Sequence, residues 1–298
     1  MWQGWKRFWT SCCAIALCLS LTTCASAPAP PPVSPSAAPS VSAAPTLLTD
    51  PFLQSPTPDA VRVVWFTEFK GRDPALILGQ PGATTIAPAR RVSATTSLLS
   101  RTYEDRDSHV NGQTADNVRY PRPHRRAVWR HEAIADRLTP GERVPYRVEI
   151  TTTRGQAIAS STFTLASSPN PGQPLKILLT SDHQLKPMTA ANLQKVKETI
   201  GKIDAVFVAG DLINIPDRAS EWFDDDRGGA FFPCLQGRAK YSLAWNNAPA
   251  TTYKGGELIQ NAPIFPALGN HEVMGRFNAQ QRLNAQFNDP VPRAVAER

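Results

Sequence analysis

Short apolar runs separated by turn residues fill the chain from Leu47 to about Ser168. The run Val61–Phe66 is rich in β-branched and aromatic residues, which favour strands. Four further runs have the same character: Ala75–Leu78, Ala127–Ile134, Val144–Thr152 and Ser160–Leu165. Gly- and Pro-containing turn signals separate them, at 70–71, 80–82, 139–141 and 154–155. This pattern predicts a small all-β sandwich over residues 47–168.

A different pattern begins after the Pro/Gly/Ser-rich stretch Ser167–Pro174, which we interpret as a domain boundary. Three apolar runs follow: Leu175–Thr180, Ala205–Ala209 and Ile264–Leu268. Between the first two, Leu193, Val196 and Ile200 have the spacing of one helix face, and Gly201 is placed to end that helix. A strand, a helix and a strand in this order predict a parallel pair in an α/β domain over residues 169–298.

Each of these three runs leads into a polar signature. The signatures are Asp182-His183-Gln184, Gly210-Asp211 and Gly269-Asn270-His271-Glu272. The carboxyl ends of parallel strands meet at one edge of a sheet, where open α/β sheets bind ligands. Carboxylate, amide and imidazole groups suit divalent metals. If the segment after the first strand is extended, Asp182 and Gln184 share a face and can reach one ion. The alternative is that these residues are only turn formers and helix caps.

The ordered signatures resemble those of the calcineurin-like metallophosphoesterases, whose pattern is D-x-H, G-D, G-N-H-[DE], a lone His and G-H-x-H. The resemblance implies an α/β (αββα sandwich) domain that hydrolyses phosphate esters with two divalent ions (Mn, Zn or Fe). By this resemblance, Asp182, Gln184 and Asp211 hold the first metal, and Asp211 and Asn270 hold the second. His271 is then expected to protonate the leaving oxygen or to stabilise the transition state, with Glu272 orienting it.

The first body also carries a resemblance. The stretches Asp50–Trp65 and Leu138–Val148 look like the start and the late strands of the fibronectin-III-like domain that precedes purple-acid-phosphatase-type catalytic domains. The combined expectation is an N-terminal fibronectin-III-like sandwich followed by an incomplete metallophosphoesterase domain.

The sequence departs from the family pattern at three points. Gln184 stands where a His is usual, and Asn214 stands where purple acid phosphatases carry a Tyr. No His follows His271, and the sequence ends at Arg298, before any lone His or G-H-x-H. We therefore expect a truncated domain that holds only one of the two metals and whose catalysis is compromised. The alternative is a non-catalytic cell-surface binding lipoprotein that uses its β-sandwich.

The N-terminus has the pattern of an export signal. Lys6 and Arg7 precede the apolar run Cys12–Leu21, which is too short to span a bilayer as a helix. Residues 21–24 (LTTC) resemble a bacterial lipobox, so residues 1–24 are predicted to be a lipoprotein signal peptide with lipidation at Cys24. Residues 25–46, rich in Pro, Ala and Ser, are predicted to be a linker from the membrane. Cleavage after residues 25–27 (ASA) is the alternative, giving a secreted or periplasmic soluble protein.

Charge and the remaining polar clusters add little to this picture. The formal net charge is +7, a mild excess that suits an anionic substrate such as a phosphorylated small molecule or ester. The basic stretch Arg119–Arg130 is interpreted as a solvated loop, with an anion or polysaccharide contact as the alternative; no nucleic-acid partner is expected.

The insertion Asp217–Asn261 is interpreted as a lid, and its Asp224-Asp225-Asp226 triplet is interpreted as a solvated turn. Cys234 is assigned no catalytic role.

Overall fold

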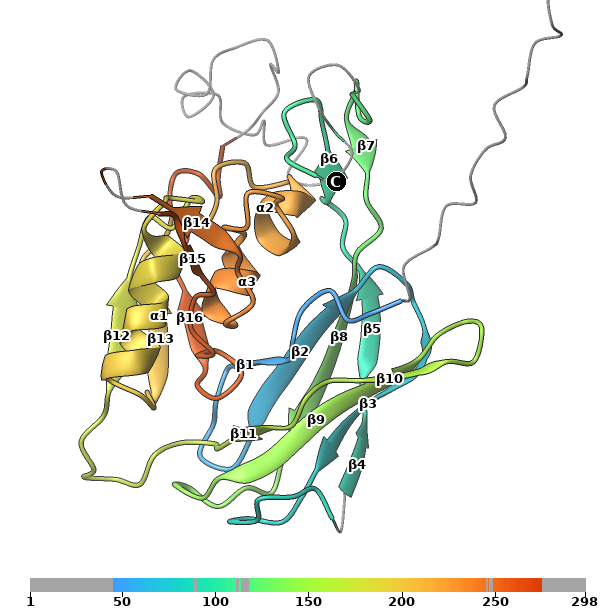
Figure 1. Cartoon of the computed structure of the whole chain (residues 1–298). Coiled ribbons are helices and arrows are strands. Elements are labelled where there is room, and N and C mark those ends of the chain that lie inside the picture. Colours follow the sequence, from blue (N-terminus) through green and yellow to red (C-terminus); the bar gives the residue numbers. More distant parts are fainter. Residues whose placement is uncertain are drawn as a thin grey trace, which may run out of the picture. The chain divides into compact units, whose positions relative to one another are not determined.

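The first part of the chain forms two antiparallel sheets (Figure 1). The computed structural model describes residues 45–87, 90–110, 113, 118–244, 246 and 249–274, which are mostly strand with few helices. One sheet has the order β1-β2-β8-β5, and the other has the order β10-β9-β3-β4 with β11 also paired to β9. Their strands are β1 (Phe52–Gln54), β2 (Val61–Thr67), β3 (Arg72–Leu78), β4 (Arg90–Ser93), β5 (Thr95–Leu98), β8 (Trp129–Ala135), β9 (Val144–Thr151), β10 (Ala157–Ala159) and β11 (Phe163–Leu165).

Side chains from both sheets fill a common core. Trp65 of β2, Leu76 of β3 and Tyr146 of β9 are all fully buried in one apolar cluster. Burial alternates along β9 from Tyr146 onward, as expected where one face of a strand meets a core and the other meets solvent. The expected all-β first body is therefore present as a two-sheet arrangement.

A short ladder extends from this body as an arm, formed by β6 (Tyr103–Glu104) and β7 (His124–Arg125). The Tyr103 amide donates to the carbonyl of Asp217, 2.7 Å away, which lies just before helix α2 (Ala219–Phe223). The arm therefore contacts a segment that follows it by more than a hundred residues.

The later part of the chain contains a three-stranded parallel sheet of order β12-β13-β16. The strands are β12 (Ile177–Thr180), β13 (Ala205–Val208) and β16 (Ile264–Pro266), and helix α1 (Thr189–Thr199) connects the first two. The parallel pairing predicted for β12 and β13 is confirmed. Between β13 and β16 the chain forms α2, α3 (Phe231–Leu235) and the hairpin of β14 (Tyr241–Leu243) and β15 (Thr251–Tyr253).

Helix α1 ends as the sequence predicts. Leu193 is buried and Val196 packs against the core, whereas Ile200 lies at the C-cap and is half exposed. Gly201 follows with φ of +73°, a left-handed conformation that costs glycine little. The helix thus covers the inner face of the sheet and returns the chain to β13.

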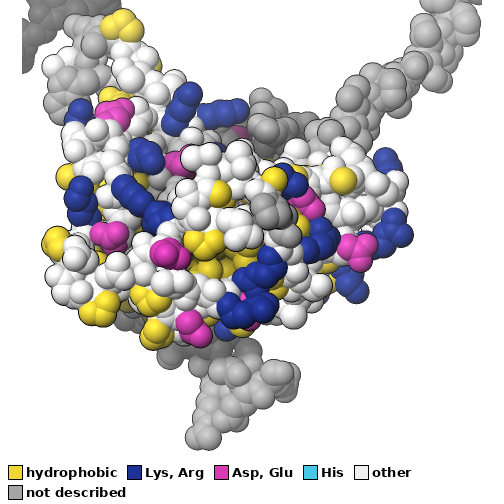
Figure 2. Space-filling view, turned by 90° about the horizontal axis from the view of Figure 1, so that it is seen from below, with side chains coloured by type: hydrophobic (Ala, Val, Ile, Leu, Met, Phe, Trp, Pro, Cys, Tyr) yellow, Lys and Arg dark blue, Asp and Glu magenta, His cyan; other side chains and the backbone are white. Residues whose placement is uncertain are grey.

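One apolar cluster joins the inner face of the parallel sheet to the first body. Phe52 and Phe66, from β1 and β2, pack on Phe232 of α3 with ring centroids 5.0 and 5.5 Å apart. The outer face of the sheet differs, because Leu179 and Phe207 on that side are exposed. In the view from below, basic and acidic side chains alternate around exposed apolar ones (Figure 2).

Hydrogen bonds at the end of the insertion also connect the two parts. The buried Tyr146 hydroxyl donates to the carbonyl of Gln260 at 2.6 Å. Asp50 and Gln236 exchange two hydrogen bonds, from the Asp50 amide to the Gln236 side chain and from that side chain back to the Asp50 carbonyl. These contacts join the two parts, which form one compact unit over the described residues.

Several predicted features lie outside the described residues. They are the signal peptide with Cys24, the linker up to residue 44, and the part of the predicted α/β domain after residue 274. Within the described ranges, none of the helices has the length and apolar character needed to cross a bilayer.

Candidate metal centre

The three polar signatures meet at the carboxyl edge of the parallel sheet. Thr180 pairs with Val208, and Val208 pairs with Pro266, so the three strands end level with one another. Beyond the strands, the Asp182 amide donates to the Gly210 carbonyl (3.2 Å) and the Gln184 amide to the Leu212 carbonyl (3.1 Å). The first two signatures therefore run side by side as a continuation of the strand pairing.

Two glycines allow the second and third signatures to touch. A Cβ on Gly210 would lie 2.8 Å from the backbone of Gly269, and a Cβ on Gly269 would lie 2.1 Å from Asp211 Oδ1. Gly210 also has φ of +85°. Only residues without a side chain fit this approach, which is why glycine precedes the polar residue in both signatures.

Backbone strain is concentrated at the candidate ligands. Asp182, Gln184 and Asp211 have φ of 52°, 36° and 53°, in the left-handed region that non-glycine residues rarely occupy. Such residues persist where surrounding contacts hold them, and they cluster at functional sites. The expectation of an extended segment with Asp182 and Gln184 on one face is wrong, because the chain turns there, leaving Asp182 exposed and Gln184 buried.

Asp211 and Asn270 are in direct contact. The Asn270 amide end lies 3.2 and 3.0 Å from the two carboxylate oxygens of Asp211, and its nitrogen, when turned toward Asp211, donates to both. Because the amide nitrogen is a donor and the carboxylate oxygens are acceptors, this orientation is the favourable one when no cation is bound. The His271 amide donates to Asp211 Oδ1 at 3.2 Å, so the carboxylate is held from the third signature as well.

Glu272 holds the two loops together. Its Oε2 accepts hydrogen bonds from the amides of Asp211 (3.0 Å) and Gly269 (2.8 Å), and its Oε1 accepts one from the amide of Leu212 (2.8 Å). The predicted role of orienting the His271 ring is therefore corrected. Glu272 fixes the backbone from which Asp211 and Asn270 project.

Asn214 orients the His271 ring instead. The ring Nδ1 lies 2.8 Å from the Asn214 carbonyl oxygen, and His271 is buried. A carbonyl accepts but cannot donate, so Nδ1 carries the proton of this hydrogen bond. The Asn214 side chain donates to the Gln184 carbonyl at 2.9 Å. Asn214 thus touches two signatures, a role that its position three residues after Asp211 could have suggested.

His183 is a packed residue and is buried. Its Nε2 lies 3.0 Å from Thr180 Oγ1, and its ring centroid lies 5.8 Å from that of Phe231. Burial lowers its pKa to about 4, although the nearby Asp182 acts in the opposite direction. The ring is therefore neutral at neutral pH, and it packs as part of the core.

The candidate metal ligands from the three signatures all present oxygen atoms. The structure brings the Asp211 carboxylate into contact with the Asn270 side chain and the His271 backbone amide, and it places the loop of Asp182 and Gln184 beside them. In the described part of the chain, no cluster of three or more His, Cys, Asp or Glu residues has the geometry of a metal site. The candidate ligands are two carboxylates and two amides, a hard-oxygen set that suits Mn²⁺ or Mg²⁺ more than Cu²⁺.

The acidic triplet is only in part the solvated turn that its charge predicts, because Asp224 and Asp226 are exposed turn residues whereas Asp225 is buried. The side chain of Asp225 is fully buried and pairs with Arg227 at 2.7 Å. Asp224 accepts two hydrogen bonds from Arg126, at 2.7 and 2.6 Å. Arg126 comes from the basic stretch 119–130, so part of that stretch is an internal ion partner rather than a solvated loop.

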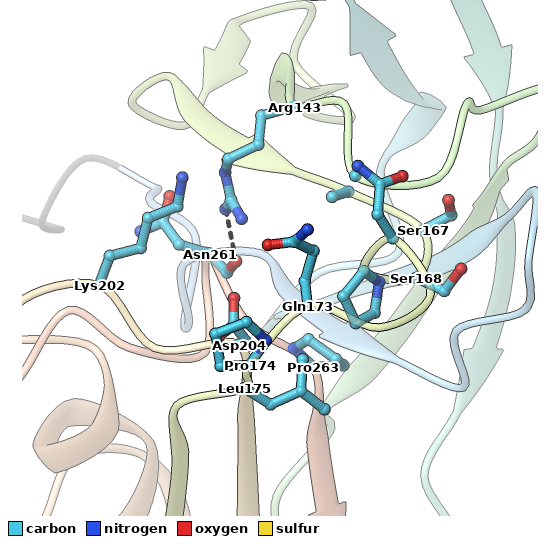
Figure 3. Close-up of a pocket in the computed structure, with 14 residues that line it drawn as sticks. Arg143, Ser167, Ser168, Gln173, Pro174, Leu175, Lys202, Asp204, Asn261 and Pro263 are labelled. Carbon is cyan, nitrogen blue, oxygen red and sulfur yellow. Dashed lines mark hydrogen bonds between the residues drawn. The ribbon is translucent and has the colours of Figure 1, made fainter.

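A cavity of about 210 Å³ lies at the other edge of the sheet, between its amino ends and the first body (Figure 3). Arg143 and Lys202 line it. The Arg143 guanidinium donates to the carbonyls of Thr164 and Asn261, so its hydrogen bonds connect the two parts of the chain. This cavity is separate from the three signatures.

No protein-family model matches the chain, and no curated protein sequence matches it. A solved structure of the purple acid phosphatase PPD1 from yellow lupin (Lupinus luteus) seeds is similar over 82% of this chain, with 20% identity and a TM-score of 0.49. The match covers 39% of the phosphatase, so this chain spans about two fifths of its length. A structure of a Br derivative of BhCBM56 matches 41% of this chain and 94% of that one, with 12% identity and a TM-score of 0.24.

Proposed function

We propose that this chain carries the metal-binding edge of a phosphoester hydrolase. The observation that supports the proposal is the contact of the Asp211 carboxylate with the Asn270 side chain and the His271 backbone amide, beside the loop of Asp182 and Gln184. Oxygen ligands at the carboxyl ends of parallel strands, held in left-handed backbone conformations, fit a metal-assisted reaction.

The residues would act in distinct ways. Asp211 and Asn270 would hold a divalent metal, with Asp182 and Gln184 as further ligands from the neighbouring loop. Such a metal supplies polarisation of a phosphoryl oxygen and activation of water. Glu272 fixes the loops through three backbone amides, so Asp211 keeps its direction during turnover.

His271 would donate a proton to the leaving oxygen. Its ring is oriented by the hydrogen bond from Nδ1 to the Asn214 carbonyl, which holds the imidazole in place for acid–base work. A phosphorylated small molecule or ester is the proposed substrate class, and the excess of basic residues in the chain suits an anion. The same proposal includes two metals, a lipid anchor at Cys24 and a location in the bacterial cell envelope.

Hydrolysis of p-nitrophenyl phosphate and bis(p-nitrophenyl) phosphate tests it directly. We expect release of nitrophenol that depends on added Mn²⁺ or Zn²⁺ and is lost in Asp211→Asn. Asp136→Asn is the matched control, because Asp136 pairs with Arg90 in the first body. Metal-independent release, or equal rates in Asp211→Asn and the wild type, would contradict the proposal. No hydrolysis and no metal binding would favour the alternative of a non-catalytic surface-binding protein.

A further inference from the structure

Asn214, which orients His271, is itself held by a buried carboxylate. Glu221 of α2 is 1% exposed, and its Oε2 accepts hydrogen bonds from the amides of Asn214 (2.8 Å) and Ile215 (3.0 Å). One carboxylate oxygen therefore fixes two consecutive peptide units. The Asn214 carbonyl that meets the His271 ring belongs to the second of them.

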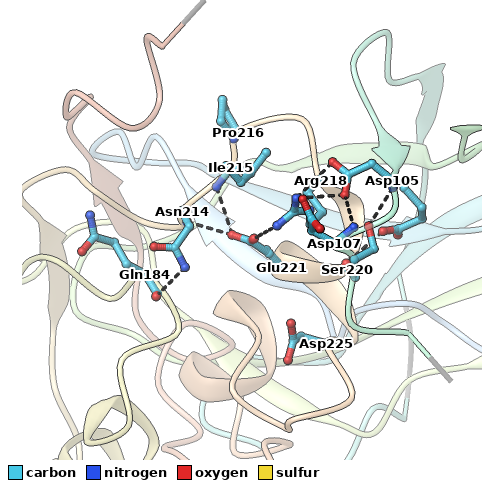
Figure 4. Close-up of polar contacts among 12 residues, drawn as sticks. Asp105, Asp107, Gln184, Asn214, Ile215, Pro216, Arg218, Ser220, Glu221 and Asp225 are labelled. Atoms are coloured by element: carbon cyan, nitrogen blue, oxygen red, sulfur yellow. Dashed lines mark hydrogen bonds and ion pairs between the residues drawn. The ribbon is translucent and has the colours of Figure 1, made fainter. Parts of the chain in front are cut away.

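The other oxygen of Glu221 faces a charged partner. Arg218 Nη1 donates to Glu221 Oε1 at 2.8 Å, and Arg218 Nη2 donates to both oxygens of Asp105, at 2.9 and 3.0 Å (Figure 4). Asp105 directly follows β6 of the arm. The arm is braced further by Ser220, whose hydroxyl donates to Glu104 at 2.9 Å. The series Asp105, Arg218, Glu221, Asn214 therefore runs from the first body to the candidate centre.

We propose that Glu221 is a positioning residue for His271, and that Asp105 and Arg218 extend this support to the arm of the first body. The proposal rests on the function proposed above, because it assigns His271 a task. It gives the first body a part in the site, where the sequence alone suggested a spacer or a binding module.

The donor arrangement explains why a carboxylate is required at position 221. Donors approach both oxygens, two backbone amides on Oε2 and one guanidinium on Oε1. A Gln side chain offers one acceptor and one donor group, so Glu221→Gln must direct its NH₂ group against either Arg218 or the 214–215 amides. A donor left facing a donor in a buried site is unfavourable, and the Asn214 peptide is expected to shift.

The test is nitrogen NMR of the histidine side chains in the full chain, with His271→Asn to identify the His271 signals. We expect His271 to be the Nδ1–H tautomer in the wild type and to lose this preference in Glu221→Gln. Mn²⁺ binding, measured by calorimetry, is expected to weaken by about tenfold or more, as for other groups that orient a metal site. Glu198→Gln is the matched control, because Glu198 is an exposed residue of α1.

The outcomes separate this inference from the proposed function. An unchanged His271 tautomer in Glu221→Gln would overturn the inference, whatever the metal affinity. A wild type that binds no Mn²⁺ would overturn the proposed function, while the tautomer would still decide the role of Glu221. If Glu221→Gln does not fold, Arg218→Lys gives the same readout, because Lys keeps the charge but cannot reach Glu221 and Asp105 with two separate groups. The expected change is then smaller and in the same direction.

Discussion

The two sheet systems of this protein differ in how their apolar faces are covered. In the first body, both sheets direct their inner residues into one core, and Trp65 and Tyr146 are fully buried there. The parallel sheet buries its inner face, with Val206 and Val208 inaccessible, but Leu179 and Ile177 on the outer face are 72% and 52% exposed. Parallel sheets are ordinarily covered on both faces. Among the described residues, the two sheets of the first body share one core, whereas the parallel sheet is packed on its inner face only.

The largest effect is expected in the core of the first body. Trp65→Ala should lower the free energy of unfolding by about 3–5 kcal/mol, because it removes a buried ring that stacks on His131 and leaves a cavity. Urea unfolding at neutral pH measures this. Trp65→Phe, which fills most of the space, should cost much less. Equal stabilities for Trp65→Ala and the wild type would refute the assignment of the core.

A second effect depends on pH and on the same core. Burial lowers the pKa of His131 to about 4, from an ordinary value of 6.5. The unfolded chain then binds the proton more readily, so stability is complete above pH 6.5 and decreases as the pH falls toward 4. At pH 5 the loss from this group should be roughly 2 kcal/mol relative to pH 7.

Unfolding of the wild type and His131→Gln at both pH values checks this expectation. The decrease between pH 7 and pH 5 should be smaller in the variant by that amount. A decrease of the same size in both proteins would show that other groups cause it.

The contact between the two parts should contribute less. Tyr146→Phe removes the hydroxyl that donates to the Gln260 carbonyl, and we expect a loss of about 1 kcal/mol. The loss should appear in both parts of the chain if they unfold together. Thermal unfolding followed by calorimetry measures it, and a separate second transition in the variant would show that Tyr146 couples the two parts.

The smallest effect is expected on the outer face of the parallel sheet. Leu179→Ser should change the free energy of unfolding by no more than about 0.5 kcal/mol, since the side chain is largely exposed already. Its counterpart on the inner face, Val208→Ser, should be clearly destabilising. If Leu179→Ser were as costly as Val208→Ser in urea unfolding, the outer face would be covered in solution and the comparison would fail.

Local patterns in the sequence predicted much of this structure. The β-branched runs gave β2 and β13, the spacing of Leu193 and Val196 gave α1, and the position of Gly201 gave its end. Parallel pairing followed from the order of strand and helix. The meeting of the three signatures at one edge followed from that pairing.

The remaining features depend on contacts between distant residues, which local patterns do not contain. The left-handed turn at Asp182 and Gln184 is held by hydrogen bonds to the loop after β13. Asp225 is buried although its neighbours in sequence are acidic, because Arg227 pairs with it. The position of Glu272 beside His271 suggests a catalytic partner, yet two of its three hydrogen bonds go to a loop about sixty residues away and the third goes to Gly269.

The central claim is that the carboxyl ends of β12, β13 and β16 form one metal-binding edge with Asp211 at its centre. Calorimetric titration of Mn²⁺ into the full chain tests it most directly, with Asp211→Asn and the control Asp136→Asn titrated in parallel. Our account predicts saturable binding by the wild type and by Asp136→Asn, and binding at least about tenfold weaker by Asp211→Asn. Equal binding by the wild type and Asp211→Asn, or no binding by the wild type, would contradict it.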